Sequence, residues 1–185
     1  MVGAVVLVVI LLGACAWAIS SGPPTHTPAP PAPPTPITPS TAPAADPAGP
    51  GALADPDAPA ARILRDWDAA RARAYAEASP SDLRALYVPR SAVGRADRRV
   101  LRAYAGRGLT VRDARMEVAE VVEVGRTGMR LRVAVVERLG PAYAVAGDGR
   151  RLPLPRDNWR ERRLVLAYAD GRWRMAAATP RAPRG

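Results

Sequence analysis

The prolines of this chain are concentrated in one segment, which separates a part that can pack from a part that cannot. Residues 22–60 contain 14 of the 21 prolines, mixed with Thr, Ser and Ala, as in the run from Thr35 to Pro39. Proline fixes φ and has no backbone N–H to donate, so such a segment favours polyproline II over helix or sheet. Residues 21–60 are therefore predicted to be a disordered, semi-rigid linker that extends about 120 Å at most.

An apolar stretch precedes this linker. The eighteen residues from Val2 to Ile19 are uncharged and mostly apolar. As a helix they would extend about 27 Å, close to the thickness of a bilayer's hydrocarbon core. Residues 1–20 are thus predicted to be a transmembrane or signal anchor. Two alternatives stay open: Leu12 to Cys15 resembles a bacterial lipobox, which would make Cys15 a lipidation site, and the stretch could be a cleaved signal peptide.

The linker also bears on where the remaining chain is located. Neither flank of the apolar stretch contains Lys or Arg, so the positive-inside rule does not decide the orientation. Proline-rich stalks hold domains away from a bilayer, and this one predicts a single-pass protein of the cell membrane with an extracytoplasmic domain, as in a bacterial envelope. The run from Pro28 to Pro31 is alternatively a PxxP ligand for an SH3-like partner.

Composition excludes several kinds of site. All 27 basic residues are arginine, and residues 61–185 carry every one of them against 14 acids. Cys15 is the only cysteine and His26 the only histidine, so neither a disulfide framework nor a Cys- or His-based metal site is expected. No phosphate loop or nucleic-acid-binding motif is present. We therefore expect no cofactor, no metal and no nucleic-acid partner.

The folded part is predicted to begin with helices. Ile63, Trp67, Ala70 and Ala74 recur at helical spacing, and Asp66 and Asp68 are interpreted as charges near that helix's start. A short second helix follows Ser79, which can cap it, with Pro80 at the first helical position. A third is expected from about Arg95 to Ala105, with Asp97 near its start and Gly106 or Gly108 as a left-handed cap.

The period then changes from 3.6 to 2, which is typical of strands with one buried face. One long strand is expected from Thr110 to Val124, with a bulge between Val118 and Val121 where the apolar alternation slips. Residues 129–135 and 164–168 alternate in the same way. Asp170 and Gly171 form a tight hairpin turn that leads into Trp173, Met175 and Ala177. A short strand is expected at 143–146 and an irregular edge at 152–155.

Helices followed by long antiparallel strands and a closing Asp-Gly-Arg-Trp hairpin (Asp170 to Trp173) resemble the NTF2-like superfamily. The segment from Leu86 to Leu109 is similar to membrane-anchored domains of this type that follow Pro-rich stalks in high-GC bacteria. The resemblance covers residues 61–180, with 181–185 as a tail. It implies an α+β fold, a cone in which N-terminal helices pack on a curved antiparallel sheet.

Enzymes of the NTF2-like superfamily, as the resemblance implies, place an acid or base inside the cone. Asp66 and Asp68 are two apart on a helix and cannot converge as a dyad, and Glu117, Glu120 and Glu123 are interpreted as a solvated row. No catalytic residue is therefore assigned. Aromatic side chains either fill the core or line a small apolar pocket. The candidates for that pocket are Trp67, Tyr75, Tyr104, Tyr143 and Trp173.

Three functions follow from these features. The leading hypothesis is a non-catalytic, membrane-tethered module that binds an envelope protein or a second copy of itself. The second is small-molecule binding, or a lyase or isomerase activity, in the cone; a cavity with a buried carboxyl or phenol of raised pKa would favour it. The third is binding of an envelope polyanion by a basic sheet face made of Arg130, Arg132, Arg163, Arg172 and Arg174.

Overall fold

The computed structural model describes residues 51–180, in which three helices precede seven strands. The helices are α1 (Ala60–Ala76), α2 (Pro80–Ala85) and α3 (Ala92–Ala105). The strands are β1 (Leu109–Arg112), β2 (Met116–Thr127), β3 (Arg130–Leu139), β4 (Tyr143–Ala146), β5 (Arg151–Pro153), β6 (Arg160–Ala169) and β7 (Arg172–Pro180).

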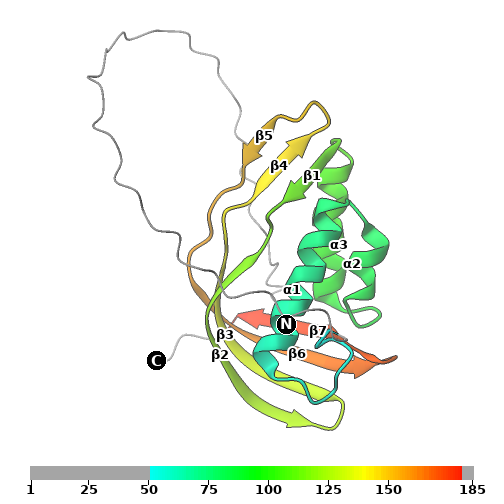
Figure 1. Cartoon of the computed structure of the whole chain (residues 1–185), viewed down its shortest axis with the longest axis vertical. Helices are drawn as coiled ribbons and strands as arrows, with labels where there is room; N and C mark the ends of the chain where they lie inside the picture. Colours follow the sequence, from blue (N-terminus) through cyan, green and yellow to red (C-terminus); the bar gives the residue numbers. More distant parts are fainter. Residues whose placement is uncertain (1–50, 181–185) are drawn as a thin grey trace, which may run out of the picture. The chain divides into compact units, whose positions relative to one another are not determined.

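The strands form two antiparallel sheets with the helices on one side of them (Figure 1). One sheet has the order β2-β3-β6-β7, and the other has the order β1-β4-β5. Curvature comes from bulges, because β2 shifts register twice against β3 and β6 shifts once against β7. The predicted α+β architecture, with N-terminal helices packed on antiparallel sheets, is confirmed.

The first helix begins earlier than its apolar pattern suggested, and this changes the role of two aspartates. Helix α1 starts at Ala60 after Pro59, and its first turn contains no acidic residue. The interpretation of Asp66 and Asp68 as charges at the start of the helix is therefore wrong. Both carboxylates instead accept backbone hydrogen bonds from distant segments: Asp66 from Ala52 N at 2.7 Å and Asp68 from Met116 N at 3.0 Å.

The caps of α2 and α3 are serines. Ser79 Oγ accepts from Asp82 N and Pro80 occupies the first helical position, as predicted. Helix α3 begins at Ala92, three residues before the expected start, because Ser91 Oγ caps it by accepting from Gly94 N at 3.1 Å. Asp97 consequently lies in the helix interior and not near its start, which corrects the sequence-based interpretation.

The expected strand from Thr110 to Val124 is two strands, β1 and β2, which belong to different sheets. Asp113 separates them with a φ of 60°, a left-handed conformation that ends strand pairing. Within β2 the register shift between Val118 and Glu120 confirms the predicted bulge. The hairpin between β6 and β7 is also confirmed, with positive φ at both Asp170 and Gly171, the geometry of a type I′ turn.

The core lies between the helices and the inward faces of β3, β6 and β7. Its largest fully buried side chains are those of Trp173, Ile63, Leu83, Leu101, Leu131, Leu166, Val111 and Val133. The segment after α2 also closes one sheet edge, because Met175 N donates to Leu86 O and Val88 N donates to Met175 O. Helix α2 and strand β7 are thereby held together.

Residues 51–59, on the N-terminal side of the expected domain boundary at residue 61, pack against the domain. Ala52 and Ala58 are buried, each with 1% of its surface exposed. Trp173 donates its backbone N–H to Leu53 O at 2.7 Å and its indole N–H to Asp55 O at 2.9 Å. Hydrogen bonding and burial thus extend the packed domain at least to Ala52, despite the proline-rich composition there.

Between residues 51 and 180, no helix combines the length and apolar character that crossing a bilayer requires. The predicted anchor (1–20), Cys15 and most of the linker (21–60) lie outside the described residues, as does the tail 181–185. The anchor, its lipidated alternative and the location of the domain stay predictions.

Helices α1 and α3 and the segment after α2 are joined through the carboxylate of Asp97. Arg71 of α1 binds it with two hydrogen bonds, from Nε to Oδ2 at 2.9 Å and from Nη2 to Oδ1 at 3.0 Å. Tyr75 donates to Oδ1 at 2.7 Å and Tyr87 donates to Oδ2 at 2.6 Å. The Arg71 and Asp97 side chains are only 12% and 11% exposed. Each carboxylate oxygen therefore has two donors, which compensates the cost of burying its charge.

The Asp97 network predicts a large loss of stability when its anion is removed. Replacing Asp97 by Ala leaves Arg71 buried without a counter-charge, and we expect the free energy of unfolding to fall by about 3–5 kcal/mol. The control is Asp157→Ala, which removes the partner of Arg160 from an ion pair whose side chains are 33% and 37% exposed. Loss of this more solvated pair should cost about 1 kcal/mol or less. Urea unfolding followed by circular dichroism measures both, and equal losses would contradict the assignment.

Candidate functional site

A cavity of about 620 Å³ lies between α1 and the start of β2. It is lined by one face of α1, by the residue that precedes β2 and by the first half of β2. The lining residues are Ala61, Leu64, Arg65, Asp68, Arg115, Met116, Val118, Ala119, Glu120 and Val121. Most of this wall is apolar, with two arginines and two carboxylates, and its volume is in the range of small-molecule sites.

Asp68 is the polar group in this cavity that the protein leaves partly unpaired. Its Oδ2 accepts from the backbone N–H of Met116 at 3.0 Å, which fixes the side chain against the start of β2. Its Oδ1 is buried, and no donor among residues 51–180 reaches it. A buried acceptor without a donor is costly, and such atoms are rare in folded proteins. Asp68 is consequently the lining residue of this cavity that has a buried acceptor without a donor in the described part of the chain.

Burial raises the pKa of the Asp68 carboxyl above its ordinary value. The hydrogen bond from Met116 and the positive charges of Arg71 and Arg115 act in the opposite direction, and Glu137 adds a smaller upward contribution. Desolvation prevails over these attractions. A carboxyl of raised pKa beside a cavity can exchange a proton with a bound molecule nearer to neutral pH than an ordinary aspartate can.

Asp97 is also a buried carboxylate, but its environment is the opposite of that of Asp68. Burial raises its pKa, but the charge and hydrogen bonds of Arg71 and the bonds from Tyr87 and Tyr75 exceed this effect, so the pKa is lowered. Burial raises the pKa of both tyrosines. All these groups are engaged with one another, so the network is structural and has no free position for a substrate.

The remaining acids are accounted for by ion pairs or solvent. Glu137, with 7% of its surface exposed, pairs with Arg162 at 2.8 Å. Glu117 pairs with Arg138 and Glu123 with Arg126, as expected for a partly solvated row beside arginines. Across residues 51–180 no group of three or more metal-ligating side chains is close enough to hold an ion.

The five aromatic candidates do not line either of the two cavities described for this domain. Four are buried: Trp67, Tyr75, Tyr104 and Trp173. Trp67 donates its indole N–H to Leu86 O at 3.0 Å and Tyr75 belongs to the Asp97 network, so both have structural partners. Tyr143 is half-buried on β4 beneath the guanidinium of Arg151. Their role in binding stays a prediction.

The proposed basic sheet face is only partly continuous. Arg130, Arg132, Arg163 and Arg172 are exposed on the sheet, as predicted. Arg174 is half-buried, pairs with Asp170 at 2.9 Å and lines a second cavity beside α2 and α3. Four of the five arginines therefore lie on the exposed sheet surface, and Arg174 lies in the second cavity.

Sequence reasoning did not find Asp68 as a site residue. Its partner Met116 is 48 positions away, and no local pattern shows which segment a helical aspartate will face. One signal was available: two aspartates flank the buried Trp67 within α1, where charges beside an apolar face require partners. The two carboxylates bind different segments, in agreement with the prediction that they cannot form a dyad.

Comparisons with known proteins give likeness of fold only. No family model and no curated protein matches the sequence. Aln2 from a Streptomyces species is 13% identical, with a TM-score of 0.43 over 63% of this chain and 85% of that one. The intermembrane space region of the chloroplast protein ARC6 is 14% identical, with a TM-score of 0.46 over 67% of this chain and 95% of that one.

A third similar structure carries NTF2 in its name and is 12% identical, with a TM-score of 0.38 over 63% of this chain and 94% of that one. All three TM-scores are below 0.5, and the fold of this chain is established from its own strand order and register.

The state of Asp68 predicts that neutralising it stabilises the protein. Because its folded-state pKa is raised, the ionised form is disfavoured in the fold, and stability falls as pH rises from the ordinary value through the folded-state pKa. Asp68→Asn should therefore raise Tm at pH 7 by about 2–5 °C. This gain should shrink in acid, where Asp68 is already protonated.

Asp66→Asn is the matched control on the same helix, since an amide oxygen can still accept from Ala52 N. Thermal unfolding followed by circular dichroism at pH 7 and pH 4 measures both variants. A lower Tm for Asp68→Asn at neutral pH would show that the anion stabilises the fold and would contradict this account of the site.

Proposed function

We propose that this chain is a small-molecule-binding module of the NTF2-like type and that the cavity between α1 and β2 is its binding site. One observation carries the proposal: the buried Oδ1 of Asp68, which has no donor within the described residues, beside a cavity of ligand size. Core carboxylates that serve only stability have complete sets of partners, as Asp97 does.

The wall of the cavity defines the class of ligand. Leu64, Met116 and Val121 present an apolar surface, while Arg65 and Arg115 contribute positive charge. A complementary molecule has an apolar body, a carbonyl or carboxylate oxygen for an arginine, and an O–H, N–H or acidic C–H for Asp68. Such a ligand places a transferable proton beside a carboxyl of raised pKa, the arrangement that lyase and isomerase chemistry requires.

We further propose that the module is tethered to a membrane and lies outside the cytoplasm. Support comes from the sequence: eighteen uncharged residues from Val2 to Ile19 are followed by a segment, residues 22–50, that contains 12 prolines. A stalk of that composition keeps a binding domain accessible at a distance from the bilayer.

Filling the cavity should weaken binding without unfolding the domain. Ala61 lines the cavity and is exposed, so Ala61→Trp adds an indole at its entrance without disturbing the core. Nitrogen-15 NMR of the full chain, titrated with phenylacetate and with cyclohexanone, reports on the amide of Met116, which is hydrogen-bonded to Asp68. We expect this resonance to shift when the wild type binds a probe. The affinity of the protein for that probe should fall about tenfold or more in the variant.

Ala103→Trp, at an exposed position of α3 outside the cavity, is the control for adding a tryptophan. The proposal fails if neither probe moves the Met116 resonance, or if the two tryptophan variants bind equally well.

A second candidate, binding of a protein partner or a second copy, is favoured by the edge of the larger sheet. Strand β2 ends that sheet, so one side of its backbone is not paired by another strand of the described domain. Val118, Val122 and Val124 on this strand are 45%, 45% and 62% exposed, and Met129 in the following turn is 58% exposed. Long edge strands with exposed apolar side chains are suited to strand addition.

This candidate predicts self-association or capture that depends on β2. Val122→Lys combined with Val124→Lys should weaken association about tenfold or more, because edge lysines oppose strand addition. Size-exclusion chromatography with light scattering, together with a pull-down from membrane extracts, tests the full chain. A monomer that retains nothing, or a complex that both lysines leave unchanged, would reject the candidate.

A further inference from the structure

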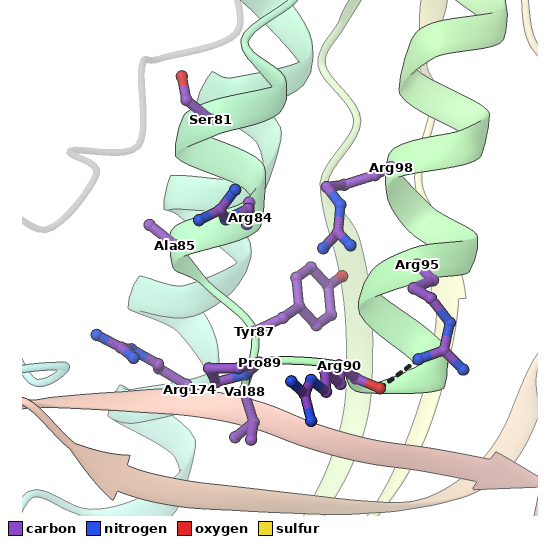
Figure 2. Close-up of a pocket in the computed structure, with 10 residues that line it drawn as sticks. All are labelled: Ser81, Arg84, Ala85, Tyr87, Val88, Pro89, Arg90, Arg95, Arg98 and Arg174. Atoms are coloured by element: carbon purple, nitrogen blue, oxygen red, sulfur yellow. Dashed lines mark hydrogen bonds between the residues drawn. The ribbon is translucent and has the colours of Figure 1, made fainter.

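A second cavity, of about 840 Å³, lies on a different part of the domain from the Asp68 site. It is formed by α2, by the segment that joins α2 to α3, by the first turns of α3 and by β7 (Figure 2). The residues around it are Ser81, Arg84, Ala85, Tyr87, Val88, Pro89, Arg90, Arg95, Arg98 and Arg174. The two cavities share no residue.

The charge of this cavity is entirely positive. Five of its ten lining residues are arginines, and none is acidic. The Asp68 cavity, by contrast, has two arginines and two acids, so the arginine content of the chain does not by itself produce such a lining. Among these five, only Arg174 forms an ion pair within the described part of the chain.

These arginines come from separate elements and line the same cavity. Arg84 is on α2, Arg90 in the connection, Arg95 and Arg98 on α3, and Arg174 on β7. In Figure 2, Arg98 reaches from α3 toward the ring of Tyr87, with Arg84 on the facing side. Gathering four cations without a carboxylate is unfavourable in the free protein, and an anion that binds among them relieves the repulsion.

The floor of the cavity is rigid. Tyr87 is 3% exposed, and its hydroxyl donates to Asp97 Oδ2 at 2.6 Å. Its ring lies directly against α3 because residue 94 is glycine: a Cβ there would come within 2.7 Å of Tyr87 Cβ and Cγ. Arg95 also donates to Arg90 O, which fixes the rim. The arginines therefore surround a surface that is already formed, which lowers the cost of binding.

We propose that this cavity is an anion site for the phosphate groups of a small phosphorylated molecule, free or as a lipid headgroup. Guanidinium groups bind phosphate through pairs of parallel hydrogen bonds, and several of them favour an anion of two or more charges. Val88, Pro89 and Ala85 supply an apolar border for the rest of the molecule. This cavity shares no residue with the Asp68 cavity, so its ligand can be tested independently of the function proposed above.

The test is titration of the full chain with inorganic pyrophosphate by isothermal calorimetry at low salt. Arg84→Gln with Arg98→Gln removes two of the arginines that line the cavity, neither of which forms one of the ion pairs found in residues 51–180. We expect the affinity of this double variant to fall about tenfold or more, since each charge-assisted hydrogen bond contributes measurably. Arg102→Gln with Arg112→Gln removes the same charge from exposed positions outside the cavity and should retain most of the affinity.

A second variant keeps every arginine. Ala85→Glu places a carboxylate at the exposed border of the cavity and should weaken pyrophosphate binding by a similar factor. Thermal unfolding verifies that each variant is folded. Co-sedimentation with vesicles of phosphatidylcholine, with or without phosphatidic acid, distinguishes the two sources of phosphate.

Pyrophosphate binding that is lost in the cavity variants supports a soluble ligand. Sedimentation that requires phosphatidic acid and the same arginines supports a lipid headgroup. Absence of both kinds of binding in the wild type overturns the proposal. It is equally overturned if the surface control loses as much affinity as the cavity variant, because the effect would then be one of net charge.

Discussion

The described domain depends on the largely buried carboxylate of Asp97. A carboxylate removed from water must be compensated, and Asp97 achieves this with two hydrogen bonds from Arg71 and one from each of two tyrosines. These donors come from α1 and from the segment after α2, so satisfying one charge fixes α1, α3 and that segment relative to each other. The same segment then pairs with β7 through Leu86 and Val88, which connects the helices to the sheet.

This arrangement positions both candidate sites. Arg71 and Asp97 fix the rotation of α1, and Asp68, one turn earlier on that helix, is thereby directed at the start of β2. Tyr87 is held in place by Asp97 and forms the floor of the arginine-lined cavity. The two aspartates show how environment decides function: complete hydrogen bonding lowers the pKa of one, and incomplete hydrogen bonding with burial raises the pKa of the other.

Local patterns predicted much of the fold. Helical spacing identified α1, the Ser79 and Pro80 pair identified the start of α2, and Asp170 with Gly171 identified the last hairpin. What could not be predicted depends on partners distant in the chain. Asp68 meets Met116, the arginines of the second cavity are spread over about ninety positions, and the break between β1 and β2 follows from the left-handed Asp113.

The expected start of the domain at residue 61 is too late for a related reason. Proline content continues through Pro56 and Pro59, yet Ala52 and Ala58 are buried because Trp173 and neighbouring side chains bind the backbone of this segment. Proline prevents regular pairing, but it does not prevent a segment from docking through its carbonyl groups, which remain acceptors. The folded part therefore includes residues that sequence composition assigned to the linker.

The most direct measurement of the central claim is a carbon-13 NMR titration of the aspartate carboxyl groups in the full chain. Our account predicts that Asp97 titrates below the ordinary aspartate value of 3.8 and that Asp68 titrates above it. Titration of both carboxyls at the ordinary value would contradict it, because neither the buried anion nor the unpaired carboxyl would then exist as described.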